Sequence, residues 1–194
     1  MPEMMRAVWF EQFGAAAEVL DVGELEAPQP EAGEVRVRIA VSGVNPVDVK
    51  RRLGGRGASQ GSRVVPHFDG AGTIESVGDG VPEFRLGERV WVYEAQYERA
   101  FGTAAELAVV ASDLAVPLPD VADFDAGACL GIPALTAHRC VFADGSVAGQ
   151  TVLVTGGAGA VGHYAVQFAK LDGATVIATV SSDDKAELAL QGGA

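Results

Sequence analysis

A cluster of glycines in the last quarter of the sequence has the spacing of a phosphate-binding turn. Gly157, Gly159 and Gly162 fit the pattern G-x-G-x-x-G, and Gly156, Gly159 and Gly162 fit the related G-x-x-G-x-x-G. Glycines let a backbone approach phosphate groups closely, and the unpaired N–H groups at the start of a following helix favour an anion. The candidate ligands of a pyrophosphate are therefore Gly156, Gly157, Ala158, Gly159, Ala160, Val161 and Gly162.

The segments on both sides of this turn supply the structural context that the motif needs. Residues 151–155 form an apolar, β-branched run, which predicts a buried parallel strand. After the turn, Val161, Ala165 and Phe168 recur at the spacing of one helix face, and residues 174–180 predict a second strand. Strand, glycine turn, helix and strand form a βαβ unit, which favours dinucleotide binding over a plain glycine-rich turn.

The end of the second predicted strand bears on which nicotinamide dinucleotide binds. An NAD-specific site places a carboxylate there to bond the ribose 2′-OH, but this sequence has Val180, Ser181 and Ser182. Lys185 is a nearby cation that would suit a 2′-phosphate. The acidic pair 183–184 is interpreted as first-turn helix charges, with Ser182 as the N-cap. We therefore expect NADPH, held by Ser181, Ser182 and Lys185.

The overall composition excludes several classes of function. The 194 residues carry a net charge of −12 without a basic block, which argues against nucleic acid and anionic membranes as partners. The apolar stretches are strand-sized and the N-terminus has no apolar signal core, so we expect no membrane span and a cytoplasmic protein. Cys129 and Cys140 cannot form a disulfide scaffold and are interpreted as buried small hydrophobes.

Residues 1–122 predict a small antiparallel β-domain. Short strands separated by turn signals are expected at 6–10, 35–41, 69–77, 89–93, 104–110 and 114–118. Gly70 and Gly72 lie inside one of them and indicate a bulge or a close backbone approach. A short helix is expected over 47–52, with Asp48 as a helix-start residue. The glycine-rich segment Gly54–Arg63 is either a lid or a plain loop.

Residues 123–194 predict the first part of a doubly wound α/β domain, so the fold class is α/β. Helices are expected over 123–129, with Asp123 as N-cap, and over 134–142, separated by a break at 131–133. A complete dinucleotide domain uses two βαβαβ halves, and this sequence holds only the first part of one. We therefore expect a truncated chain, or a partner chain that completes the sheet.

Five stretches in this order and spacing resemble the zinc-free quinone oxidoreductases of the medium-chain dehydrogenase/reductase superfamily, the group that includes zeta-crystallin. They are residues 43–48, 70–78, 87–90, 131–137 and the glycine turn 156–162. The resemblance implies a GroES-like catalytic domain over 1–122 and the N-terminal part of a Rossmann NADPH-binding domain over 123–194. It also implies a homodimer for the full-length protein.

The resemblance further implies that no metal takes part in the reaction. Zinc-containing relatives place a cysteine where this chain has Asn45, a histidine where it has Phe68, and a third ligand near Leu130. A catalytic zinc needs three protein ligands, so we expect no metal site. His67 neighbours one of these positions and is interpreted as a polar loop histidine near the cleft.

By the same resemblance, the expected reaction is direct hydride transfer from NADPH to a quinone. Asn45 is either the group whose amide orients a substrate carbonyl beside the nicotinamide or a turn residue before Pro46. Thr136 corresponds to a family threonine at the cofactor cleft, or else is a helix hydroxyl bonded to its own backbone. Lys50 and Arg56 stand where several relatives carry tyrosines, which leaves the substrate class open.

Three alternatives to a quinone reductase stay open at this point. The same scaffold could reduce an enone or an enoyl-thioester. The protein could bind NADPH as a structural protein without turnover. The chain could also be inactive because part of the cofactor domain is missing.

Overall fold

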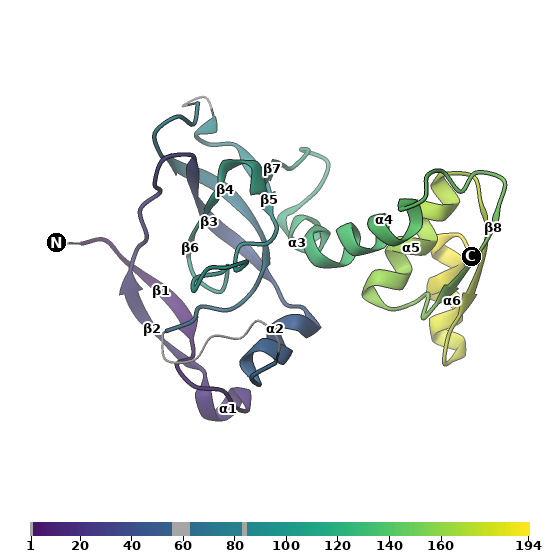
Figure 1. The fold of residues 1–194 in the computed structure, drawn as a ribbon, viewed down its shortest axis with the longest axis horizontal. Helices are drawn as coiled ribbons and strands as arrows, with labels where there is room; N and C mark the ends of the chain where they lie inside the picture. Colours follow the sequence, from purple (N-terminus) through teal and green to yellow (C-terminus); the bar gives the residue numbers. More distant parts are fainter. Residues whose placement is uncertain (1, 56–62, 83–84) are drawn as a thin grey trace. The chain divides into compact units, whose positions relative to one another are not determined.

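The computed structural model describes residues 2–55, 63–82 and 85–194 (Figure 1). The chain divides into two compact units, Met1–Ile132 and Pro133–Ala194. The sequence pattern predicts the boundary after residue 122, whereas in the structure the segment 123–132 belongs to the first unit. The reason is that helix α3 (Phe124–Ala128) packs against the sheet of that unit.

A five-stranded antiparallel sheet forms the body of the first unit. Its strand order is β6-β3-β4-β5-β7, and its strands are β3 (Glu34–Gly43), β4 (Asp69–Val77), β5 (Arg89–Val92), β6 (Leu107–Ala111) and β7 (Ala115–Pro117). A short 3₁₀ helix (Ser112–Leu114) joins the last two strands. Alternating apolar side chains fill the core, including Val35, Val37, Ile74, Val90 and Val110. The predicted antiparallel β-domain is therefore confirmed.

A second antiparallel sheet pairs β1 (Met4–Trp9) with β2 (Asp21–Glu26), and the short helix α1 (Ala16–Val19) lies between them in the chain. The sequence pattern predicts neither β2 nor α1, because residues 21–26 mix acids and a glycine with only two apolar residues. What fixes β2 is its partner. A Cβ on Gly23 would lie 2.9 Å from the ring of Trp9, so the glycine makes room for that tryptophan.

Gly72 and Gly43 explain how the sheet bends and how α3 reaches it. A Cβ on Gly72 would lie 2.0 Å from the carbonyl oxygen of Arg38, at a register shift between β3 and β4. A Cβ on Gly43 would lie 2.3 Å from the carbonyl oxygen of Ala128, the last residue of α3. The predicted close backbone approach in β4 is thus confirmed at Gly72.

The chain does not break between α3 and α4. Asp123 caps α3 as predicted, accepting a hydrogen bond of 2.8 Å from the Ala126 N–H. A π-helical turn, Leu130–Ala134, then leads directly into α4 (Leu135–Phe142). The predicted break at 131–133 is therefore wrong, because the wider π turn accommodates Pro133 without interrupting the helical path.

The second unit contains the predicted βαβ arrangement. Strand β8 (Thr151–Thr155) pairs in parallel with β9 (Thr175–Thr179), helix α5 (Ala160–Leu171) connects them, and α6 (Asp183–Gly192) follows. The core is formed by small and branched side chains from α4, α5 and both strands, including Ala137, Val154, Ala165, Val166, Ala169 and Val176. The sequence pattern thus predicts the order and type of these elements correctly.

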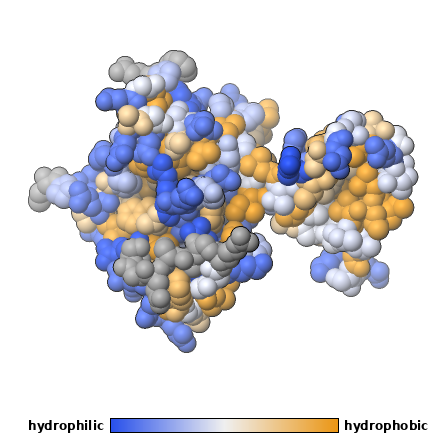
Figure 2. Space-filling view, in the orientation of Figure 1, coloured by the Kyte–Doolittle hydropathy of each residue, from blue (hydrophilic) through white to orange (hydrophobic). Residues whose placement is uncertain are grey.

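The two parallel strands are buried on one face only. Val154 and Val176 are packed in the core, whereas Leu153 and Ile177 are 62% and 54% exposed, and Figure 2 shows apolar surface on this unit. The prediction of a buried strand is wrong for that second face, because no described segment covers it. Val161 is also exposed, since it lies in the first turn of α5, beyond the packed stripe.

Both cysteines are exposed, so their predicted burial is wrong. Neither forms a disulfide. Cys129 is the C-cap of α3, and Cys140 lies beside the stripe by which Ala137 and Val141 pack α4 into the core. Within the described ranges, we find no helix long and apolar enough to cross a membrane.

Candidate dinucleotide-binding site

The turn between β8 and α5 presents unpaired backbone N–H groups. Gly156 has a positive φ of +68°, and the N–H of Gly159 donates to its carbonyl oxygen at 2.8 Å. Gly159 is the N-cap of α5 and offers no side chain to cap the helix. Among the described residues, none accepts a hydrogen bond from the N–H groups of Ala160, Val161 or Gly162. The helix start is thus free to receive an anionic ligand.

Two glycines of the motif are required by close contacts. A Cβ on Gly162 would lie 2.1 Å from the carbonyl oxygen of Gly156, which lets the first turn of α5 fold back against the loop. A Cβ on Gly157 would lie 2.6 Å from the Cβ of Ala178 in β9. These contacts hold the loop against both the helix and the neighbouring strand.

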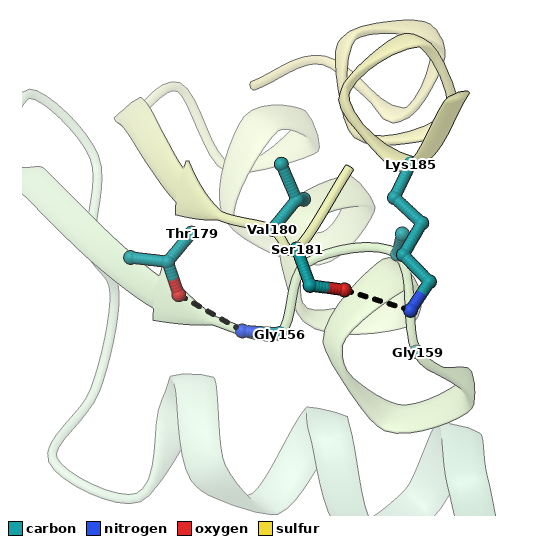
Figure 3. Close-up of a pocket in the computed structure, with 7 residues that line it drawn as sticks. Gly156, Gly159, Thr179, Val180, Ser181 and Lys185 are labelled. Carbon is teal, nitrogen blue, oxygen red and sulfur yellow. Dashed lines mark hydrogen bonds between the residues drawn. The ribbon is translucent and has the colours of Figure 1, made fainter. Parts of the chain in front are cut away.

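A cavity of about 390 Å³ opens at this turn (Figure 3). It is lined by Gly156, Ala158, Gly159, Thr179, Val180, Ser181 and Lys185. The ammonium group of Lys185 donates to the hydroxyl of Ser181 at 2.9 Å, and the N–H of Gly156 donates to the hydroxyl of Thr179 at 3.2 Å. The structure therefore brings the glycine turn and the end of β9 to one cavity.

The lining of this cavity contains one cation and no carboxylate. Lys185 lies in the first turn of α6, and its side chain extends to Ser181 at the end of β9, as Figure 3 shows. Asp183 and Asp184 lie in the same helical turn but do not line the cavity. A site of this composition suits an extra phosphate better than a free ribose 2′-OH.

Some of the predicted ligands lie outside this cavity. Gly157 and Gly162 do not line the cavity, but their close contacts with Ala178 and Gly156 shape the turn. Ser182 occupies the predicted N-cap position of α6, but its side chain makes no capping hydrogen bond. Thr136 is exposed on α4, and no hydrogen bond from it to its own backbone is found. Thr179 lines the cavity but is not among the predicted ligands. Its place as the last residue of β9 is a signal that could have indicated it.

A second cluster of functional interest surrounds Asn45 in the first unit. Asn45 is the N-cap of α2 (Pro46–Arg52), and its backbone N–H donates to the Asp48 carboxylate at 2.6 Å. Its side-chain Nδ2 donates to the Asp69 carboxylate at 2.7 Å, and that same oxygen accepts from the Ile132 N–H at 2.7 Å. Asn45, Asp48 and Asp69 are all buried. The backbone of Asn45 is therefore held by α2, and its side-chain amide is held by the start of β4.

Burial perturbs both carboxyl groups of this cluster. It raises the pKa of Asp48 to about 6, and the negative charge of Asp69 acts in the same direction, against the N–H groups of Asn45 and Phe68. Burial also raises the pKa of Asp69, opposed by its hydrogen bonds from Ile132 and Asn45. Burial thus makes both carboxyl groups harder to ionise than they are in water.

The sequence pattern predicts Asp48 as a helix-start residue but does not indicate the role of Asp69. An acid three residues after Asn45 is a recognisable capping signal, whereas Asp69 is simply the first residue of a strand. Within the described segments, no group of three or more His, Cys, Asp or Glu side chains could hold a metal ion. Most of the segment Gly54–Arg63, including Arg56, lies outside the described residues.

Comparison with known proteins identifies the class to which this chain belongs. Residues 31–120 match the family model of the alcohol dehydrogenase GroES-like domain. Quinone oxidoreductase from Rattus norvegicus is 37% identical over 193 residues, which cover 99% of this chain and 57% of the relative. The chain therefore spans little more than half the length of that relative.

Two solved structures extend the comparison. A mycobacterial protein in complex with NADPH has a TM-score of 0.84 and 32% identity, covering 98% of this chain and 56% of its own. A cobalt- and zinc-bound alcohol dehydrogenase from Pyrobaculum aerophilum has a TM-score of 0.87 and 34% identity, covering 99% of this chain and 64% of its own.

Together with the GroES-like sheet and the glycine turn, these matches show that the chain belongs to the medium-chain dehydrogenase/reductase superfamily of oxidoreductases. Quinone oxidoreductases from Rattus norvegicus, Mus musculus and Pseudomonas aeruginosa, at 36–37% identity, are among the similar proteins, and this is the group that the sequence resembles.

Proposed function

We propose that this protein binds NADPH and transfers its hydride to a quinone. The observation that carries the proposal is the cavity in which an uncapped helix start and Lys185 face the same space. The names of the quinone oxidoreductase relatives, and the NADPH complex of the mycobacterial protein, support the same cofactor and acceptor.

The residues of the second unit fit NADPH in two places. The free N–H groups of Ala160, Val161 and Gly162 suit the pyrophosphate, because they add to the positive end of the α5 dipole. The Ser181–Lys185 pair suits the 2′-phosphate, since it offers a hydroxyl and an ammonium 2.9 Å apart. Ser182 is a further candidate ligand, because its hydroxyl follows Ser181 at the end of the second strand, and Thr136 is another on the resemblance alone.

Asn45 is the proposed substrate-orienting residue of the first unit. Its Nδ2 gives one hydrogen to the carboxylate of Asp69, which leaves a second hydrogen for a substrate carbonyl oxygen. NADPH, when bound, supplies the hydride that the quinone accepts. Asn45 would orient the quinone and stabilise the negative charge that develops on its oxygen.

We also propose that the reaction needs no metal ion. Asn45 and Phe68 occupy positions at which zinc-containing relatives carry ligands, and the described residues form no alternative ligand cluster. Activity should therefore survive dialysis against EDTA. Loss of activity on dialysis, restored by added zinc, would contradict this part of the proposal.

The cofactor assignment is tested with Lys185→Glu. We expect NADPH binding, measured by isothermal titration calorimetry, to weaken at least about tenfold, while NADH binding changes little. Lys170→Glu is the matched control. It makes the same charge change in the last turn of α5, at the opposite end of that helix from the glycine turn. Equal NADPH affinity in wild type and Lys185→Glu would show that the 2′-phosphate does not bind here.

The acceptor is tested by turnover of NADPH with 1,4-benzoquinone and with an alkenal, side by side. Faster oxidation of NADPH by the quinone supports the proposal. Faster oxidation by the alkenal would indicate an enone or enoyl-thioester reductase instead. Tight NADPH binding without oxidation by either acceptor would indicate a binding protein.

The resemblance to quinone oxidoreductases also leads us to propose a homodimer and a cytoplasmic location. The two cysteines are free, which is compatible with a reducing compartment. Sedimentation of the expressed protein and fractionation of its cells would test the two proposals separately.

A further inference from the structure

Three side chains in the first unit form a continuous hydrogen-bonded chain that the proposed reaction does not use. They come from the end of β3, the segment before β4 and the segment before β6. Nδ1 of His67 lies 2.9 Å from Oγ of Ser42, which in turn lies 2.8 Å from Oγ1 of Thr103. The hydroxyl of Thr103 donates to the carbonyl oxygen of Asp69 at 2.5 Å.

The direction of these hydrogen bonds fixes the protonation of the His67 ring. A carbonyl oxygen can only accept, so the hydroxyl hydrogen of Thr103 is used on Asp69. Thr103 must then accept from Ser42, and Ser42, having given its own hydrogen, must accept from His67. Nδ1 of His67 therefore carries a hydrogen, and in the neutral ring Nε2 carries a lone pair.

The surrounding structure holds His67 in this position at a conformational cost. Its φ is +81°, in the left-handed region that costs a non-glycine residue about 1 kcal/mol. The Thr103 N–H donates to its carbonyl oxygen at 3.0 Å, and a Cβ on Gly102 would lie 2.0 Å from that same oxygen. Both the backbone and the ring of His67 are thus fixed before any ligand arrives.

Nε2 of His67 has no hydrogen-bond partner among the described residues, yet it is not a buried atom. The residue lines two recesses. The larger, of about 450 Å³, is within the usual range for small-molecule sites and also includes Ser42, Thr103, Val8, Val22 and Ile39. The smaller, of about 180 Å³, lies on the side of α2.

Four charged side chains share these recesses with His67. Arg6 and Glu106 line the larger one, and Asp48 and Arg52 line the smaller one. Burial lowers the pKa of His67, so its ring is neutral at pH 7. The larger recess is thus bounded by apolar side chains, by Arg6 and Glu106, and by the neutral ring of His67.

We propose that Nε2 of His67 is the hydrogen-bond acceptor of a second ligand site in the larger recess, one that binds a neutral aromatic hydroxyl compound of the phenol class. The lone pair repels anions, and the described residues form no cluster of three or more side chains that could hold a metal ion. The site uses residues of the first unit alone, so it does not depend on NADPH or on the proposed hydride transfer.

The direct test is a titration of the 194-residue chain with phenol, followed by NMR of ¹⁵N-labelled histidine rings. The three histidines give separate signals, which single substitutions assign. We expect His67 to be protonated at Nδ1 and bare at Nε2, and only its Nε2 signal to move on addition of phenol. A ring protonated at Nε2, or a phenol titration that leaves its signal unchanged, would overturn the proposal.

Anisole provides the matched ligand, because it keeps the aromatic ring and has no hydroxyl hydrogen to donate. We expect anisole to bind at least about tenfold more weakly than phenol. Equal binding of the two compounds would show that the recess holds aromatic rings without the His67 acceptor.

Substitution of Thr103 tests the hydrogen-bonded chain itself. In Thr103→Val, Ser42 loses its acceptor and should donate to Nδ1 of His67, which moves the ring hydrogen to Nε2 and weakens phenol binding at least about tenfold. Thr103→Ser keeps the hydroxyl and should keep the wild-type tautomer and affinity. If the valine variant does not fold, His67→Asn replaces it, since asparagine tolerates a positive φ. Unchanged phenol affinity in whichever variant is used contradicts the proposal.

Discussion

The buried carboxyl group of Asp48 should give the first unit a specific pH dependence of stability. Its pKa rises from 3.8 to about 6 on folding, so between these values the folded state keeps a proton that the unfolded chain has lost. The free energy of unfolding then falls by about 1.4 kcal/mol per pH unit. The stabilisation, about 3 kcal/mol in all, is complete below the unfolded pKa and is lost as the pH rises through the folded pKa.

The variant Asp48→Asn isolates this contribution, because asparagine keeps an oxygen for the Asn45 N–H and does not titrate. The free energy of unfolding is measured in urea at a series of pH values from 4 to 8. Between these two values, we expect the free energy of unfolding of the variant to rise relative to that of wild type by about 2–3 kcal/mol. Unfolding is followed by the fluorescence of Trp9 and Trp91, which both lie in the first unit.

Asp113→Asn is the control, because it removes the charge of an exposed carboxylate in the same unit. This variant controls for the change in net charge, because it does not remove a buried carboxyl group. The reasoning is refuted if the difference between wild type and Asp48→Asn is the same at pH 4 and pH 8. In that case the carboxyl group is not buried as the structure has it.

Three further substitutions test individual contacts. Gly162→Ala would place a methyl group 2.1 Å from the carbonyl oxygen of Gly156. We expect the affinity for NADPH to fall at least about tenfold. A calorimetric titration that shows wild-type affinity would contradict the proposal that this turn binds NADPH. Gly131→Ala would place a methyl group 2.1 Å from Asp69 Oδ1; the overpacking should lower the free energy of unfolding of the first unit by about 1–3 kcal/mol, measured by tryptophan fluorescence in urea. Val166→Ala empties part of a fully buried site in α5; thermal unfolding followed by circular dichroism should show a loss of about 2 kcal/mol, and an unchanged midpoint would mean that this core is not formed.

The glycine turn shows what can be predicted from local sequence. The contacts that require Gly162 and the uncapped N–H groups of α5 involve residues only a few positions apart. The geometry of a strand, a tight turn and a helix is largely set by neighbouring residues, so the spacing of glycines is sufficient to predict it. The same holds for the caps Asp123 and Asn45, whose partners lie three residues away.

The burial of individual residues was predicted less well, because burial depends on what packs against them. Leu153 is as apolar as Val154 and adjacent to it, yet only Val154 is covered. Cys140 is exposed although it lies next to the packed stripe of α4. Strand β2 likewise owes its existence to pairing with β1, which its own composition does not reveal.

By itself, the sequence determined the order of the elements, the glycine turn before α5 and the absence of an acid at the end of the second strand, because each of these depends on residue type and short spacing. Only the tertiary structure decided that Asn45 meets Asp69, that Lys185 faces the glycine turn, and that Ser42 links His67 to Thr103. In the sequence, Ser42 is 25 positions from His67 and 61 positions from Thr103. Strand register and packing bring such side chains within hydrogen-bond distance, and neither is encoded in any short stretch of the chain.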